Sequence, residues 1–359
     1  MKVLHLPTSV AGQAFAISEG ERSLGIESDY LLMFKDDIHY PEVPYMFDYP
    51  PESLSDSFKY IPKLIKKYCE IKMSDYDILH FNFSRSLWDY PGLFDMVDLT
   101  FGYSQKIFVT FNGCDGRVRS YTDEYSPCSS PSCFNRVCKD KDFDVVKTKR
   151  IAKWDKYSSG MFVATPDLLR GLPERTQYIP NTMYGWNVIK PVDHKEHEKF
   201  TIVHAPSNRW IKGTDIIIRV VDKLQRKCPD KIRLILVENM TRKQALEMYQ
   251  LADLAIDQIK LGWYGVFSIE CMKMGIPVMA YANLYDKNEI PKQMADDLDK
   301  SLINVNPDTL EYVLEEILYK PSILDGYREC GMEFAEKWHS PSYVSKLTKS
   351  AYENALRGD

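Results

Sequence analysis

Residues 200–226 read FTIVHAPSNRWIKGTDIIIRVVDKLQR and contain the clearest signal of the fold. The apolar run at 200–204 predicts a buried strand, and 213–226 predict a helix. Apolar residues recur there at helical spacing, at Ile216, Ile217, Val220, Val221 and Leu224. A strand that passes through a short polar loop into an amphipathic helix is the unit from which parallel α/β sheets are built.

The same alternation continues on both sides of this unit. Downstream, the sequence predicts strands and helices over 232–237, 241–252, 254–257, 267–274, 276–280, 308–319 and 341–356. Upstream, it predicts them over 3–6, 13–24, 28–33, 57–72, 77–83, 106–111 and 161–165, with a helix starting at Pro166. Such alternation is typical of an α/β protein with a parallel sheet covered on both faces.

A polar stretch divides the alternation into two halves. Residues 185–199 include the charged run HKEHEK, a composition typical of an exposed linker. His194 and His197 in this run could share a metal, but a solvated linker is the preferred interpretation. We therefore predict two Rossmann-like domains, 1–184 and 200–338, that face each other across a cleft. Ligands of such sheets bind at the carboxyl ends of the strands.

Two cations lie between the strand and the helix of the first segment. Arg209 and Lys212 are three residues apart in what we interpret as a loop, and Gly213 lets the backbone turn into the helix. Arg offers a bidentate fork for phosphate oxygens, and Lys offers a movable point charge. The alternative is a pair of solvated cations, and the pair alone does not decide between the two.

A second segment, GWYGVFSIECMKMGIPV at 262–278, adds an anion-binding feature. Residues 265–268 are expected to open a helix, whose free N–H groups and positive end suit a diphosphate. Glu270 lies too close to that end to be a phosphate ligand. Its expected role is to accept hydrogen bonds from ribose hydroxyls, and the alternative is a carboxylate that only stabilises the helix start.

The patterns HAPSNRWIKGTD, LADLAID and GWYGVFSIECMKMGIPV resemble the C-terminal domain of family-4 retaining glycosyltransferases of the GT-B fold. The resemblance implies that Arg209 and Lys212 hold the donor diphosphate and that Glu270 binds its ribose. The glycine loop of that family, near the donor phosphates, corresponds to the loop at Gly12. Further donor contacts implied by the resemblance are Tyr264, Gly265, Val266, Phe267 and Ser268.

The resemblance extends over nearly the whole chain. NGCDGR at 112–117 is similar to the family's His-Gly-x-Asp-x-Arg turn, which implies acceptor-side roles for Asn112, Asp115 and Arg117. FVATPDLL at 162–169 matches the stretch that closes the first domain. The final helix, within 339–359, resembles the one that crosses back to the first domain.

Two departures from the family pattern concern the sugar and the acceptor. Gly262 stands where the family has the first of two glutamates, which often contacts the transferred sugar, and Asp257 is a weaker substitute. Asn112 stands where a histidine is common, so His80, Asn82 or Asp115 could take over polar contacts there.

The resemblance implies metal-independent, retaining transfer of a sugar from a nucleoside-diphosphate sugar, with UDP or GDP as carrier. The acceptor would be a glycan, a lipid-linked sugar or another hydroxyl, in the synthesis of a cell-surface polysaccharide or glycoconjugate. Two alternatives stay open. One is a catalytically silent protein that keeps the nucleotide pocket, and the other is a GT-B-like sugar-nucleotide epimerase.

Four cysteines, Cys114, Cys128, Cys133 and Cys138, fall within one polar segment at about 114–140. Four thiols are the number that a structural zinc site needs, and a reducing compartment favours metal over disulfides. The spacing also allows one or two disulfides or free thiols, and these alternatives stay open.

Composition excludes several other classes of protein. Apolar residues make up 44% of the 359 and charged residues 27%, as in globular proteins, and the net charge of −5 gives no basic field for nucleic acid. The sequence contains no apolar run long enough to span a bilayer and starts without a signal-peptide pattern. We expect a cytoplasmic protein, with peripheral contact to a membrane surface left open.

Overall fold

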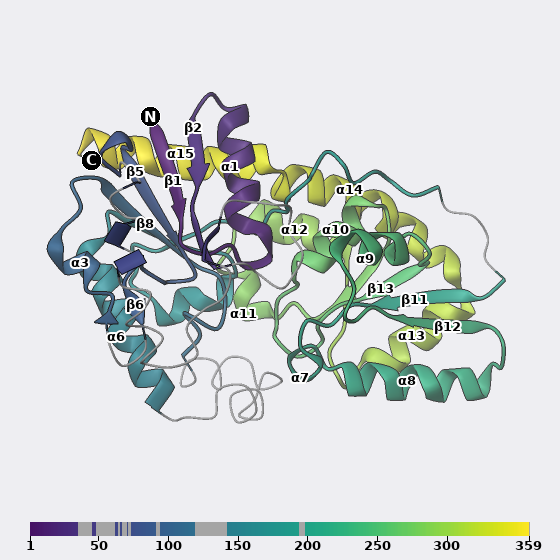
Figure 1. Ribbon diagram of the computed structural model, residues 1–359. Helices are drawn as coiled ribbons and strands as arrows, with labels where there is room; N and C mark the ends of the chain where they lie inside the picture. Colours follow the sequence, from purple (N-terminus) through teal and green to yellow (C-terminus); the bar gives the residue numbers. More distant parts are fainter. Residues whose placement is uncertain are drawn as a thin grey trace. The chain divides into compact units, whose positions relative to one another are not determined.

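The computed structural model describes residues 1–34, 45–47, 62–63, 65–66, 70, 73–90, 94–118, 142–193 and 198–358. They form two compact α/β units, and Figure 1 labels many of their helices and strands. The first unit combines Met1–Val118, Asp144–Tyr184 and Pro341–Asp359, so the end of the chain returns to it. The second unit is built on Gly185–Ser340.

The first unit contains a six-stranded parallel sheet in the order β10-β9-β8-β5-β1-β2. Its strands are β1 (Lys2–Leu6), β2 (Glu27–Tyr30), β5 (Ile78–Asn82), β8 (Lys106–Phe111), β9 (Gly160–Val163) and β10 (Gln177–Tyr178). The β5 strand is buried along its whole length, because it lies in the interior of a sheet whose two faces are both covered. The short pairs outside this sheet are β3 (Leu32–Phe34) with β4 (Tyr45–Phe47), and β6 (Asp89–Tyr90) with β7 (Phe94–Asp95).

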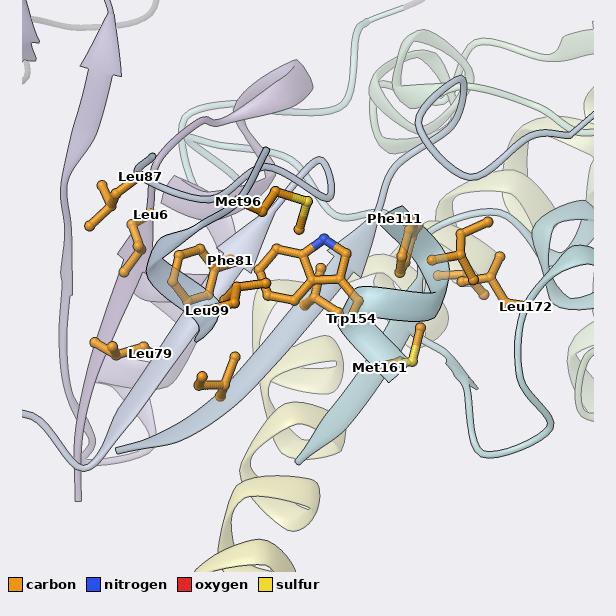
Figure 2. Packing of buried hydrophobic residues seen from close by; sticks show 14 of the residues in the cluster. Leu6, Leu79, Phe81, Leu87, Met96, Leu99, Phe111, Trp154, Met161 and Leu172 are labelled. Carbon is orange, nitrogen blue, oxygen red and sulfur yellow. The ribbon is translucent and has the colours of Figure 1, made fainter. Parts of the chain in front are cut away.

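One face of this sheet packs around Trp154, which lies on α6 (Asp142–Tyr157) and is fully buried. The Trp154 and Phe81 ring centroids lie 5.1 Å apart, and the indole Nε1 donates a hydrogen bond to the Ser84 carbonyl at 2.9 Å. Figure 2 shows the indole among the side chains of Phe81, Leu99 and Met96. The short elements α3 (Asp98–Phe101), η1 (Val10–Gly12), η2 (Met73–Asp75) and η4 (Pro166–Gly171) complete this unit.

The opposite face is covered by α1 (Gln13–Ser23) and α15 (Pro341–Arg357), which run side by side (Figure 1). Tyr352 of α15 is buried against Phe108, with ring centroids 4.8 Å apart. Its hydroxyl lies 2.5 Å from His80 Nδ1. The last helix is therefore part of the core of the first unit, as the resemblance implied.

The second unit contains a five-stranded parallel sheet in the order β12-β11-β13-β14-β15. Its strands are β11 (Phe200–His204), β12 (Ile232–Leu236), β13 (Leu254–Ile256), β14 (Val278–Ala280) and β15 (Leu302–Asn304). Its helices are α7 (Arg209–Lys212), α8 (Thr214–Lys227), α9 (Arg242–Tyr249), α10 (Val266–Lys273), α11 (Leu284–Lys287), α12 (Lys292–Ser301), α13 (Leu310–Tyr319), η5 (Pro321–Ile323) and α14 (Leu324–His339). Apolar residues of α8 and α13 pack against the sheet, as their spacing predicted.

The structure differs from the predicted elements at several places. The single strand predicted over 28–33 is two strands, β2 and β3. After Tyr30, Leu31 N donates to His5 O of β1, and Met33 N then donates to Pro7 O, which lies beyond the end of β1. The helix starting at Pro166 is a 3-10 helix. The helix predicted over 57–72 lies mostly outside the described residues. Elements that the sequence analysis did not assign include α6, α12, α14 and β15.

No helix within the described ranges combines the length and apolar character that crossing a bilayer requires.

Candidate functional site

Strand β11 ends with a buried histidine, His204. The ring of His204 is buried, with Nδ1 donating to the Ile256 carbonyl at 2.6 Å and Nε2 accepting from the Thr214 hydroxyl at 2.8 Å. Burial lowers the pKa of His204 to about 4, and the nearby Lys212 contributes to the shift. His204 is therefore neutral and ties the end of β11 to β13 and α8.

Arg209 and Lys212 lie on a helical turn, α7, and not in an irregular loop as the sequence analysis expected. The Asn208 side chain caps this turn, with its Oδ1 accepting from the amides of Trp210 and Ile211, both at 3.0 Å. Gly213, at φ 80°, ends α7 and caps α8 in a left-handed conformation that favours glycine.

Lys212 is buried against a carboxylate that the sequence analysis mentioned only as a substitute for the missing glutamate. Its Nζ lies 2.5 Å from Oδ1 of Asp257, which follows β13 and is fully buried. The other oxygen, Oδ2, accepts hydrogen bonds from the Gly265 amide at 2.8 Å and the Ser268 hydroxyl at 2.7 Å. Burial alone would raise the pKa of Asp257, but Lys212 and these two donors lower it below its usual value.

The start of α10 is therefore partly occupied by a carboxylate of the chain itself. The prediction that all amides of 265–268 are free is wrong for two of them. The Gly265 amide bonds to Asp257, and the Ser268 amide bonds to the Gly265 carbonyl. Among the described residues, the amides of Val266 and Phe267 have no acceptor. A Cβ added at Gly265 would lie 3.2 Å from Asp257 Oδ2 and 3.6 Å from Lys212 Nζ, so only glycine leaves this space open.

Arg209 is paired with Glu238, which follows β12. Arg209 Nε and Nη2 donate to the two carboxylate oxygens, each at 2.7 Å, in a bidentate fork. The Arg209 side chain is about half exposed, at 49%. Because β11 lies between β12 and β13, the loop after β11 meets one carboxylate from each neighbouring strand end.

Glu270 is buried on α10 and pairs with Arg242, the first residue of α9. Both Nε and Nη2 of Arg242 donate to the same oxygen, Oε1, at 3.0 and 2.9 Å. Burial raises the pKa of Glu270, and Arg242 and Lys212 only partly offset this.

Three residues predicted or discussed for the donor site, Tyr264, Gly262 and Phe267, make contacts within the protein. Tyr264 is buried, and its hydroxyl lies 3.0 Å from His339 Nε2. Gly262 has φ 78°, a conformation that a glutamate would adopt only with strain, and its carbonyl accepts from the Asn283 amide at 2.9 Å. The phenyl ring of Phe267 packs edge-on against Tyr249.

The acceptor-side residues lie in the first unit, at the carboxyl ends of β5 and β8. Gly12 caps α1 in the same unit, with φ 73°. His80 is in the core, and its two ring nitrogens contact Tyr352 and Thr110 at 2.5 and 2.6 Å. Burial lowers the pKa of His80 well below its usual value. We therefore do not carry His80 into the proposed site, because both nitrogens are engaged inside the protein.

Asn82 and Asn112 each keep one polar atom without a partner. Asn82 Oδ1 and Asn112 Nδ2 are buried and have no hydrogen-bond partner within the described part of the chain, whereas Asn112 Oδ1 accepts from the Phe83 amide at 3.0 Å. Asp115 accepts from the Asn112 and Gly113 amides, and burial raises its pKa to about 6. Arg117 donates to Asp167 at 2.7 Å.

The predicted zinc site falls mainly on residues that the structure does not describe. Cys128, Cys133 and Cys138 lie outside the described residues, and Cys114 is a free, partly exposed thiol. Over the described residues, three or more metal-ligating side chains do not cluster anywhere. The zinc site stays a prediction.

Comparison with known proteins shows similarity in structure only. No protein-family model and no curated protein match the sequence. Sucrose-phosphate synthase from Thermosynechococcus elongatus has a TM-score of 0.65 at 14% identity, over 100% of both chains. A glycosyltransferase from Rickettsia africae ESF-5 gives 0.57 at 13% identity, over 99% of this chain and 98% of that one.

The catalytic domain of starch synthase IV from Arabidopsis thaliana, bound to ADP and acarbose, gives a TM-score of 0.60 at 12% identity over 99% of each chain. At such identities the similarity concerns the fold alone. With two parallel-sheet α/β units and matches over the full length, the chain has the GT-B fold, which confirms that prediction.

Proposed function

We propose that the chain is a glycosyltransferase that moves a sugar from a nucleoside-diphosphate sugar to a hydroxyl acceptor. The observation that carries the proposal is the grouping at the carboxyl ends of β11 and β13. Lys212 lies beside the start of α10, Arg209 stands on the same helical turn α7, and Glu270 follows on α10. The fold is one that known glycosyltransferases share.

The donor diphosphate would bind between α7 and the start of α10. Lys212 has three N–H donors and gives one to Asp257, and Arg209 has five and gives two to Glu238. Both side chains therefore keep donors for phosphate oxygens while their internal pairs persist. The amides of Val266 and Phe267 add the positive end of α10. These groups stabilise the negative charge that grows on the leaving diphosphate as the glycosidic bond breaks.

Glu270 would accept hydrogen bonds from the ribose hydroxyls. In the first unit, the unpartnered atoms of Asn82 and Asn112, together with Asp115 and Arg117, would contact the acceptor. In line with the family resemblance, we propose metal-independent transfer with retention, from a UDP- or GDP-sugar to a glycan or lipid-linked acceptor. The reaction class would be the extension of a polysaccharide or glycoconjugate.

The experiment is a thermal-shift screen with UDP, GDP, ADP and their sugars, followed by a turnover assay with the donor that binds best. ADP is included because the starch synthase IV domain was solved with it. A ligand that binds only the folded state raises the unfolding midpoint. We expect one nucleotide series to stabilise the protein and its sugar to be transferred or slowly hydrolysed. The absence of any shift would contradict the proposal.

A silent nucleotide-sugar-binding protein is the second candidate. Gly262 supports it, because a left-handed glycine replaces the glutamate that often contacts the sugar in the family that the chain resembles. Nucleotide binding without turnover on a broad acceptor panel would favour this second function.

The Glu238 carboxylate partly neutralises the positive charge that Arg209 would offer to the donor diphosphate. Replacing it in a Glu238→Gln variant is expected to raise the affinity for the nucleoside diphosphate by about two- to fivefold at low salt, and by less at high salt. Calorimetric titration at both salt concentrations measures this. Glu311→Gln, which removes a surface carboxylate paired with Lys223, is the matched control and should leave the affinity unchanged.

A further inference from the structure

Glu270 is held by the protein through only one of its two oxygens. Arg242 Nε and Nη2 both donate to Oε1, at 3.0 and 2.9 Å, and do not form the fork that Arg209 makes with Glu238. Within the residues that the structure describes, Oε2 receives no hydrogen bond. A carboxylate oxygen can accept about two hydrogen bonds, so Oε2 keeps its full capacity.

The backbone that carries Arg242 is fixed by a helix cap. Arg242 begins α9 directly after Thr241, whose capping box with Gln244 fixes the start of that helix. The same loop between β12 and α9 also carries Glu238, which contacts Arg209. One loop therefore reaches both a residue proposed for the diphosphate and the residue proposed for the ribose.

A buried carboxylate needs such a partner to stay ionised. Burial raises the pKa of Glu270, and the cations that oppose this are Arg242 on α9 and Lys212 on α7. Tyr249 on α9 and Cys271 on α10 also face Glu270, and burial raises the pKa of both, so they stay neutral. Without Arg242, the carboxyl group would be more often protonated and free to rotate.

We infer that Arg242 is a positioning residue for nucleotide recognition, which rests on the proposed function. It occupies Oε1, keeps the carboxylate charged, and thereby leaves Oε2 as a fixed acceptor for the ribose hydroxyls of a ribonucleoside diphosphate. Arg242 then acts through Glu270 on ribose recognition, not on the diphosphate.

The test compares three probes by calorimetric titration. They are the nucleoside diphosphate that binds best, its 2′,3′-dideoxy counterpart and inorganic pyrophosphate. The variants are Arg242→Gln, Arg242→Lys, Glu270→Gln and the double variant with both glutamines. Lys243→Gln is the matched control, because it removes the neighbouring exposed cation of α9.

We expect the unaltered chain to prefer the ribonucleotide to the dideoxy form by about tenfold or more, as a hydrogen bond to a charged group allows. Arg242→Gln should lose most of this preference, as should Glu270→Gln, and the double variant should lose no more than either. Pyrophosphate affinity should stay unchanged in all of them, and circular dichroism spectra that match the unaltered chain show independently that the variants are folded. The preference of Arg242→Lys for the ribonucleotide should lie between those of the unaltered chain and Arg242→Gln. This variant decides the test if Arg242→Gln does not fold.

Two outcomes would contradict the inference in distinguishable ways. If Arg242→Gln keeps the full preference for ribose, Arg242 has only a structural role. If the folded Arg242→Gln variant loses pyrophosphate affinity, Arg242 contacts the phosphates itself. Either result overturns the positioning role and leaves the proposed function standing. If the unaltered chain binds no nucleotide, the proposed function fails and this inference fails with it.

Discussion

Replacing Lys212 by methionine is expected to lower kcat/KM for the donor sugar by about two to three orders of magnitude. The Lys212 side chain is 9% exposed and sits between Asp257 and the start of α10, where charge on a leaving diphosphate would develop. In such a water-poor place a fixed cation stabilises the transition state far more than a surface cation does. Steady-state kinetics with the donor identified by the binding screen measure the loss.

The same substitution changes stability, so a second variant separates the two effects. Lys212→Met leaves the Asp257 carboxylate buried without its cation, which costs about 3–5 kcal/mol of unfolding free energy. Adding Asp257→Asn removes that charge and should recover much of the stability but none of the activity. Lys223→Met, at a surface pair with Glu311, is the control and should change neither. Activity that returned in the double variant would show that Lys212 acts only through folding.

The fold was predictable from the sequence because its strands differ clearly in composition from the segments around them. The central strands of both sheets are buried on both faces and therefore read as short apolar runs between helices. Helix α14 was not predicted from the sequence, because Gly326 and Gly331 lower its helix propensity. Packing outweighs that cost, since α14 packs on α10 and buries Phe334, Ala335 and Trp338.

Candidate residues for the site could be chosen from the sequence, but their pairings could not. Arg209, Lys212 and Glu270 stand in local patterns that indicate their chemistry. Their partners Glu238, Asp257 and Arg242 come from 28 to 45 residues away and meet them only because β12 and β13 flank β11. Periodicity along one sequence does not say which charged loops will meet at a sheet edge. Asp257 therefore looked like a replacement for the family's glutamate, while its contacts are with the α10 start.

Replacing Gly20 by alanine is expected to destabilise the first unit, although alanine is the better helix former. In the interior of a helix the exchange would normally stabilise by about 1 kcal/mol. A Cβ at Gly20 of α1, however, would lie 2.3 Å from the Pro341 carbonyl oxygen and 2.3 Å from Ser345 Oγ on α15. Because a backbone carbonyl cannot swing away, the two helices must separate. We expect a net loss of about 1–3 kcal/mol, as overpacked cores show.

The measurement for this exchange should be local, since a chain of two units need not unfold in one step. Amide hydrogen exchange followed on peptides of α15 reports the opening of that helix. In Gly20→Ala, exchange along α15 should accelerate, because separation also weakens the Ser345 bond to Ile17 and the Thr348 bond to Glu21. Gly326→Ala on α14 is the matched control: nothing lies within 4 Å of its Cβ, so the ordinary stabilisation should appear. Unchanged exchange along α15 in Gly20→Ala would show that the packing of α1 on α15 tolerates the added methyl group.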